Sequence, residues 1–141
     1  MTCPRLSSVV EDFLTQVADW AVARTDILAV ALVGSYARGT AHRDSDVDLV
    51  VLTAVPLEYT ADVNWARQFG SVARHGIEQW GRVTSVRVWY ESSLEVEFGF
   101  ATPEWAATPL DEGTRRVVAG GIRVLMDRGA VLLDLAEGQT G

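Results

Sequence analysis

Lysine is absent from this chain of 141 residues, so all 12 of its basic side chains other than histidine are arginines. A chain without lysine cannot form a Schiff base, and it also lacks the Gly-x-x-x-x-Gly-Lys motif of a P-loop, so both chemistries are excluded. Cysteine is nearly absent as well. Cys3 is the single one, which excludes an internal disulfide and favours a reducing, cytoplasmic environment.

Long apolar runs and an excess of positive charge are also missing. No apolar stretch reaches the roughly 18 residues that a membrane span requires, and residues 1–5 lack the apolar segment of a secretory signal. The net charge of −7 argues against nonspecific binding to nucleic acid, which needs clustered positive charge. With 48% hydrophobic residues, we expect one domain over residues 1–141.

Two short apolar runs frame the most informative stretch of the chain. Residues 27–33 and 49–52 are rich in Val, Leu and Ile, and we interpret them as buried strands, the second spanning 46–53. The first run ends at Gly34-Ser35, where glycine lets a ligand approach the backbone and serine offers a hydroxyl and an amide. A short helix that starts there would offer free N–H groups to an anion.

The second run begins with paired carboxylates. Asp46 and Asp48 lie two residues apart, so on a strand both point to the same face, with Cα atoms roughly 7 Å apart. Two such carboxylates repel each other unless a divalent cation neutralises them, and hard oxygen ligands suit Mg²⁺ or Mn²⁺. A phosphate-binding turn beside a dicarboxylate metal site predicts a site for a nucleoside triphosphate.

The whole stretch resembles a known family. In chain order, the pattern is Gly34-Ser35, Ala37-Arg38-Gly39 and Ser45-Asp46-Val47-Asp48-Leu49-Val50-Val51. In these residues the chain is similar to the minimal nucleotidyltransferases of the DNA polymerase beta superfamily, and residues 27–53 carry the match. The resemblance implies an α/β (α+β) domain with the nucleotidyltransferase fold: a mixed sheet of four to five strands flanked by helices mainly on one face.

A third carboxylate is expected on a later strand. Two-metal phosphoryl-transfer sites commonly use one to ligate a metal and to accept the proton of the attacking hydroxyl. Residues 82–91 and 94–100 predict a hairpin with a two-residue loop at 92–93, and Glu95 and Glu97 share one face of its return strand. Either glutamate can supply the carboxylate. The resemblance favours Glu97, although many family members carry Asp there.

The rest of the chain predicts a packing framework. Residues 6–23 carry apolar side chains at helical spacing and predict an amphipathic helix. Residues 61–69 predict a second helix, whereas 71–81 fit no single element. A short helix and a short strand are expected at 111–119 and 122–126.

The resemblance also implies an activity. The chain would transfer a nucleoside monophosphate from a nucleoside triphosphate, with ATP as the first candidate, to a hydroxyl acceptor and release pyrophosphate. The implied catalytic residues, which would also hold one or two Mg²⁺ (or Mn²⁺) ions, are Asp46, Asp48 and Glu97. The implied nucleotide-binding residues are Gly34, Ser35 and Arg38, with Arg43 as a further candidate for a phosphate contact.

The sequence does not identify the acceptor of the nucleoside monophosphate. Larger members of the superfamily add a helical acceptor domain, and we expect none within residues 1–141, so a second copy in a homodimer or a small helical partner protein would complete the site. The acceptor is then a small molecule, such as an aminoglycoside-like antibiotic, or a protein. Two alternatives are an antitoxin-type protein nucleotidylyltransferase paired with a helical toxin, and a catalytically inactive nucleotide-binding or scaffolding module. For all of them we expect a cytoplasmic protein without membrane or nucleic-acid partners.

Overall fold

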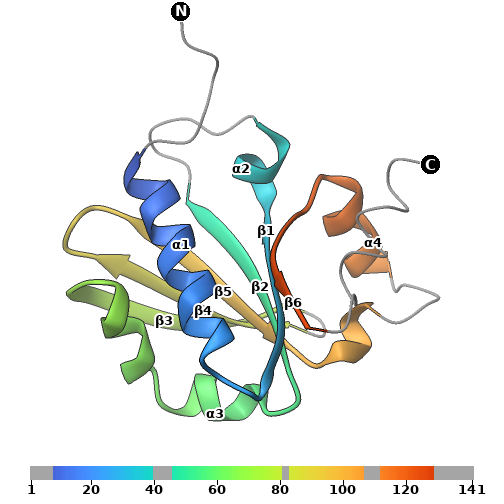
Figure 1. Ribbon diagram of the computed structural model, residues 1–141, viewed down its shortest axis with the longest axis horizontal. Helices are drawn as coiled ribbons and strands as arrows, with labels where there is room; N and C mark the ends of the chain where they lie inside the picture. The colour runs from blue at the N-terminus through green and yellow to red at the C-terminus, as the bar shows by residue number, and fades with distance from the viewer. Residues whose placement is uncertain (1–7, 40–45, 81–82, 107–111, 129–141) are drawn as a thin grey trace, which may run out of the picture.

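The chain folds around a six-stranded mixed sheet, shown in Figure 1. The computed structural model describes residues 8–39, 46–80, 83–106 and 112–128. Its elements are α1 (Ser8–Val22), β1 (Ile27–Val33), α2 (Gly34–Arg38), β2 (Val47–Thr53), α3 (Pro56–Ala61), η1 (Asn64–Phe69), β3 (Val72–Trp80), β4 (Val83–Tyr90), β5 (Glu95–Ala101), η2 (Pro103–Ala106), α4 (Glu112–Ala119) and β6 (Arg123–Asp127). The strand order is β3-β4-β5-β2-β1-β6; β2 and β5 are parallel, and the other neighbouring pairs are antiparallel.

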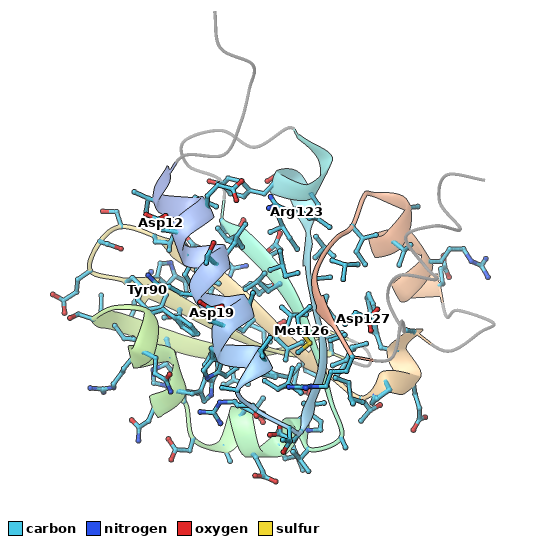
Figure 2. All side chains as sticks on the ribbon, viewed as in Figure 1. Asp12, Asp19, Tyr90, Arg123, Met126 and Asp127 are labelled. Atoms are coloured by element: carbon cyan, nitrogen blue, oxygen red, sulfur yellow. The ribbon has the colours of Figure 1, made fainter. Side chains whose placement is uncertain are left out.

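Helix α1 lies across one face of the sheet (Figure 1), as the helical spacing of its apolar side chains predicts. Phe13 meets Phe69 of η1 and Phe98 of β5 edge to face, with ring centroids 5.6 and 6.1 Å apart. Tyr90 lies beside this helix in Figure 2, and its hydroxyl donates to the Ala66 carbonyl oxygen. Burial of a ring such as Phe13 or Phe98 stabilises the folded state by about 1.5–3 kcal/mol. Neither α1 nor any other helix in the described residues is long and apolar enough to cross a membrane.

The opposite face of the sheet is covered only in part. Trp105 and Ala106 of η2 and Val118 of α4 pack there against small and branched side chains of β1 and β2, such as Ala31 and Leu52. This second core is the smaller of the two, as expected for helices placed mainly on one face. On β2 the apolar side chains of this face come after Asp46 and Asp48 in the chain. The apolar cluster formed with η2 and α4 therefore does not include the positions of the two carboxylates.

The strand at 27–33, the short helix that follows it and the helix at 6–23 are confirmed as β1, α2 and α1. The single helix predicted at 61–69 is wrong in its bounds. Pro56 opens a separate helix, α3, and the chain breaks at Asp62, whose side chain accepts a hydrogen bond from the Asn64 backbone N–H at 3.0 Å. That local bond competes with a continuous helix, so residues 64–69 form the 3₁₀ turn η1 instead.

The sixth strand comes from residues that the sequence left unassigned. Residues 72–80 form β3, an edge strand that pairs with β4. Most of its side chains are exposed on both faces, including Arg74, His75 and Ile77, so no alternation of apolar and polar residues marks it as a strand. Its backbone pairing with β4 decides the structure, and the sheet therefore exceeds the expected four to five strands.

The β4–β5 hairpin is present, but the two-residue loop predicted at 92–93 is wrong. The Tyr90 backbone N–H donates to the Leu94 carbonyl oxygen at 2.9 Å, which makes a three-residue loop of residues 91–93. Ser93 takes the left-handed conformation with φ at 80°, as the last residue of a three-residue hairpin loop commonly does. The longer loop shifts the strand register by one residue, and this shift determines which side chains meet at the candidate site.

Candidate active site

One row of side chains crosses the uncovered part of the sheet. Strand pairing sets Val33 of β1 opposite Asp48 of β2, Asp48 opposite Glu97 of β5, Glu97 opposite Arg87 of β4, and Arg87 opposite Gly76 of β3. Residues directly opposite each other on neighbouring strands point to the same face at about 5 Å spacing. The sheet therefore brings together carboxylates and one guanidinium from three different strands.

Three carboxylates converge in this row. Asp46, Asp48 and Glu97 each offer a carboxylate oxygen, and these oxygens all lie within 4.8 Å of one another. Asp46 immediately precedes β2 and shares a face with Asp48, as the two-residue period predicts. Glu95 lies on the same face of β5 but outside this group. Of the two glutamates left open by the sequence, Glu97 is the one that the sheet places against Asp48.

Gly34 closes the site on the β1 side. It begins α2 with φ at +76°, in the left-handed region that L side chains rarely adopt, and a Cβ built there would overlap the Oδ2 atom of Asp48. Glycine is thus required twice at this position, for the turn and for the close approach of Asp48. Figure 1 shows α2 directly after β1 and close to the start of β2, which matches this contact.

The other predicted nucleotide-binding residues follow Gly34. Ser35 lies in the first turn of α2, and Arg38 is its last residue, so the backbone brings both to the same end of the sheet as Asp48. Arg43 lies outside the described residues. Tyr36 is also near the carboxylates: burial, and then the negative charge of Asp46, raise the pKa of its phenol above the ordinary value.

Arg87 is the residue of this site that the sequence did not single out. Its guanidinium donates a hydrogen bond to Glu95 and another, at 2.7 Å, to the Oε1 atom of Glu97. It also lies 3.4 Å from Glu78 and 3.6 Å from Asp46. The alternation along residues 83–90 puts Arg87 on the face of its strand that also carries Ser85 and Trp89. Only the correct hairpin register sets Arg87 opposite Glu97.

The crowding of negative charge changes the acidity of two members. Burial, followed by the negative charges of Asp46 and Glu97, raises the pKa of Asp48 to about 7 against the lowering influence of Arg87. Burial likewise raises the pKa of Glu97, although its hydrogen bond with Arg87 opposes the rise. In the absence of a metal ion, Arg87 therefore neutralises the negative charge around Asp48 only in part.

The donor set fits a hard divalent cation. Carboxylate oxygens are the ligands that Mg²⁺ and Mn²⁺ prefer, and three of them meet on one half-buried surface. Burial is the main cause of the raised pKa of Asp48, and the second cause, the negative charge of Asp46 and Glu97, is one that such an ion would counter. The cluster can thus hold a cation, and a protonated Asp48 is the group that would compete with it.

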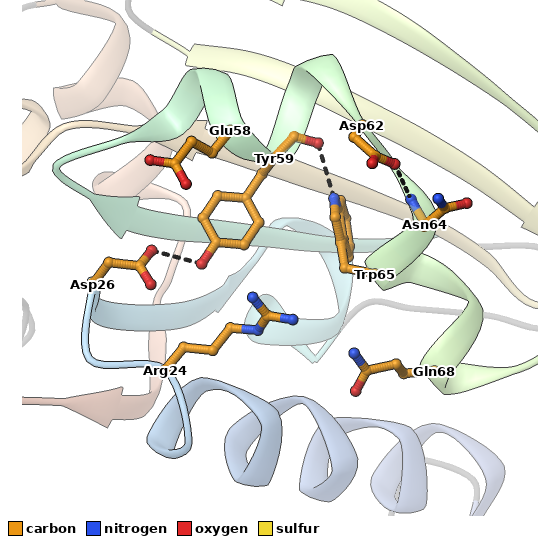
Figure 3. A pocket seen from close by; sticks show the side chains of 8 residues that line it. All are labelled: Arg24, Asp26, Glu58, Tyr59, Asp62, Asn64, Trp65 and Gln68. Atoms are coloured by element: carbon orange, nitrogen blue, oxygen red, sulfur yellow. Dashed lines mark hydrogen bonds between the residues drawn. The ribbon is translucent and has the colours of Figure 1, made fainter.

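A hollow of about 390 Å³ lies at the other end of β1 (Figure 3). Several of its polar groups are hydrogen-bonded to one another. The Tyr59 hydroxyl donates to Asp26 at 2.6 Å, and the Trp65 indole donates to the Tyr59 carbonyl oxygen at 2.8 Å. Burial, followed by the hydrogen bond with Asp26, raises the pKa of Tyr59 to about 12. None of the predicted site residues lines this hollow, and its contacts support the packing of α3 and η1 on the sheet.

Comparisons with known proteins agree with this geometry. The sequence pattern of the nucleotidyltransferase domain family matches residues 16–96. The fold is similar to an aminoglycoside 6-adenyltransferase from Bacillus subtilis (14% identity, TM-score 0.53, covering 72% of this chain and 37% of that chain). It is also similar to the polymerase core of TRAMP, an RNA surveillance complex (12%, 0.53, 68% and 33%), and to a CCA-adding enzyme (14%, 0.52, 95% and 33%).

These identities are low, so the likeness to solved structures speaks for the fold alone. It confirms the nucleotidyltransferase fold expected from the sequence. The chain spans about a third of the length of the proteins it resembles. No curated protein sequence matches it.

Proposed function

The chain belongs to the nucleotidyltransferase domain family, and we propose that it is an active, metal-dependent member of it. It transfers a nucleoside monophosphate from a nucleoside triphosphate, with ATP as the first candidate, to a hydroxyl acceptor and releases pyrophosphate. The observation that carries this proposal is the convergence of Asp46, Asp48 and Glu97 within 4.8 Å, directly beside the Gly34 turn. A scaffold without catalytic function would not need to keep three carboxylates in this electrostatically unfavourable arrangement.

In this proposal Asp46, Asp48 and Glu97 hold Mg²⁺ or Mn²⁺. When bound, the ion supplies charge stabilisation for the phosphoryl oxygens and the departing pyrophosphate. Glu97 accepts the proton of the acceptor hydroxyl as the acceptor oxygen bonds to the α-phosphorus and the bond to pyrophosphate breaks. Burial raises the pKa of Glu97 above its ordinary value, which makes this carboxylate a better proton acceptor.

The nucleotide is bound on the α2 side of the cluster. We assign Gly34 and Ser35 to the phosphate-binding turn: Gly34 contributes its backbone, and Ser35 offers its amide and hydroxyl to the β- and γ-phosphates. Arg38, at the end of the same short helix, is assigned to a phosphate contact. These three residues then line the side of the carboxylate cluster on which the triphosphate binds.

The acceptor is a hydroxyl on a small molecule, a protein or an RNA. The expectation that nucleic acid is excluded is not supported, because the similar structures include the polymerase core of an RNA surveillance complex beside an aminoglycoside adenyltransferase. The net charge of −7 favours a cationic small molecule over RNA. The rest of the acceptor pocket would come from outside residues 1–141, for example from a second copy of the chain or a small helical protein, in the cytoplasm to which the cysteine usage points.

A label-transfer assay tests the proposal. The purified protein is incubated with Mg²⁺, α-labelled nucleoside triphosphates and cell extract, and label is followed onto small molecules, RNA and protein separately. The matched pair Glu97→Gln and Glu95→Gln decides the site, since both glutamates lie on one face of β5 and contact Arg87. We expect Glu97→Gln to lose at least about 100-fold in rate, and Glu95→Gln to retain most of it.

Each result has a separate meaning. Label on a protein of the extract would favour the antitoxin-type hypothesis, and label on a small molecule or an RNA names the acceptor class directly. Magnesium-dependent nucleotide binding without transfer in any extract would favour an inactive nucleotide-binding module. Equal activity of the two glutamine variants would refute the role given to Glu97.

A further inference from the structure

Arg87 is held by four carboxylates. Its guanidinium contacts two carboxylates of the proposed metal cluster, Glu97 at 2.7 Å and Asp46 at 3.6 Å. It also contacts two carboxylates outside that cluster, Glu95 and Glu78. The Arg87 side chain is only 26% exposed, so these contacts are partly shielded from water. Arg87 is therefore hydrogen-bonded to Glu97 and ion-paired with Asp46, so a positive charge already lies against two of the three carboxylates.

A divalent cation and this guanidinium cannot both use the same oxygens fully. The carboxylates that a metal ion would bind are those whose charge Arg87 now neutralises, and two cations a few ångströms apart repel each other. Glu95 and Glu78 lie outside the three-carboxylate group, on β5 and β3. They give the guanidinium a place to remain paired after it leaves Glu97 and Asp46, so a small shift of one side chain is sufficient.

We propose that Arg87 is a built-in counter-ion of the active site, which holds Glu97 and Asp46 in the metal-free protein and exchanges for the metal ion when it binds, withdrawing to Glu95 and Glu78. This assignment rests on the metal site of the proposed function, but not on transfer itself. Arg87 thereby sets the metal affinity: it keeps the metal-free cluster folded and makes cation binding weaker than three free carboxylates would allow. Arg87 is a positioning residue, because it acts on the metal through its ligands.

The first test measures Mn²⁺ binding directly, by the electron paramagnetic resonance signal of free Mn²⁺, without nucleotide or acceptor. We expect Arg87→Met to bind Mn²⁺ about tenfold more tightly than the wild type at low ionic strength, because a competing cation is removed. The double variant Arg87→Met/Glu95→Gln keeps the net charge of the group unchanged. It should still bind more tightly than wild type, which separates competition for the oxygens from a general change of charge.

The second test uses the wild-type protein, so it does not depend on a variant that folds. The side-chain Nε–Hε signal of Arg87 in a nitrogen-15 NMR spectrum should shift in a saturable manner as Mg²⁺ is added, while an arginine remote from the cluster such as Arg128 stays unchanged. Arg128 donates instead to carbonyl oxygens at the far end of β1, including that of Ile27 at 2.8 Å.

The inference is overturned if Arg87→Met binds Mn²⁺ equally or more weakly, if neither protein binds Mn²⁺, or if the Arg87 signal ignores saturating Mg²⁺. These outcomes are independent of catalysis. A protein that fails to transfer nucleotide but shows the expected order of Mn²⁺ affinities would leave the exchange intact and remove only the proposed activity.

Discussion

The sharpest consequence of the site concerns Asp48, whose replacement by asparagine should abolish activity and yet stabilise the metal-free protein. The pKa of Asp48 rises from 3.8 to about 7 on folding, chiefly through burial. The folded state thus binds a proton more tightly than the unfolded chain does, so the free energy of unfolding falls as the pH rises from about 4 to about 7 and stays low above it. The asparagine of Asp48→Asn cannot titrate, and its amide can donate to Asp46 as a protonated Asp48 would.

The size of the effect follows from the shift. About 3 pKa units correspond to about 4 kcal/mol at full value. Asp48 is only half-buried, so solvent screening reduces this to about 1–2 kcal/mol. For a chain of this length, that gain corresponds to a rise of about 3–8 °C in the midpoint of thermal unfolding at pH 8. Below about pH 4 the carboxyl is protonated in both states, and the variant should match the wild type.

Thermal unfolding in a chelating buffer of low ionic strength, at steps from about pH 4 to about pH 8, provides the measurement. Asp12→Asn is the control, because Asp12 is an exposed carboxylate on α1 (Figure 2), and α1 packs with Leu49 on the face of the sheet opposite to that of Asp48. At pH values above 7, added Mg²⁺ should raise the thermal unfolding midpoint of the wild type and leave that of Asp48→Asn unchanged. A variant that is no more stable than wild type at pH 8, or that gains equally at pH 4, would refute the reasoning.

Two further substitutions test the backbone of the site and of the hairpin. Gly34→Ala should reduce transfer at least about 100-fold and cost about 1–2 kcal/mol of stability, because the new Cβ overlaps Asp48. The control is Gly39→Ala, which should keep transfer because Gly39 has the same φ of 76° but open space around its Cβ position. Equal losses of transfer in the two variants would contradict the overlap. Ser93→Gly should raise stability by about 0.5–1 kcal/mol in thermal unfolding, because φ is 80° at Ser93. Ser92→Gly should give no gain, and an equal gain there would show that the left-handed conformation of Ser93 stores no strain.

The carboxylate pair was predictable because its geometry is local. Two aspartates at spacing two on a strand must share a face, and a glycine after a buried strand permits the turn that the structure places at Gly34. The choice between Glu95 and Glu97 was not local. Both share a face of β5, and only the pairing of β5 with β2, in which Asp48 lies opposite Glu97, separates them.

Arg87 and β3 escaped prediction for different reasons. With a two-residue loop, Arg87 would lie opposite Phe98; the three-residue loop, with Ser93 at positive φ, sets it opposite Glu97 instead. A shift of one residue changes which face of the partner strand a side chain meets. Strand β3 carries no apolar alternation because it is an exposed edge, so its own residues contain no signal for the strand.

By itself, the sequence determined the elements that depend on near neighbours: the strand before Gly34, the short helix after it, the paired aspartates and the amphipathic α1. These follow from backbone preference and from periodic burial, both of which act over a few residues. Only the tertiary structure decided that β5 lies parallel to β2 and that Arg87 enters the carboxylate cluster. Such contacts join residues far apart in the chain, and they are selected by how the whole sheet buries its apolar faces while leaving one polar row uncovered.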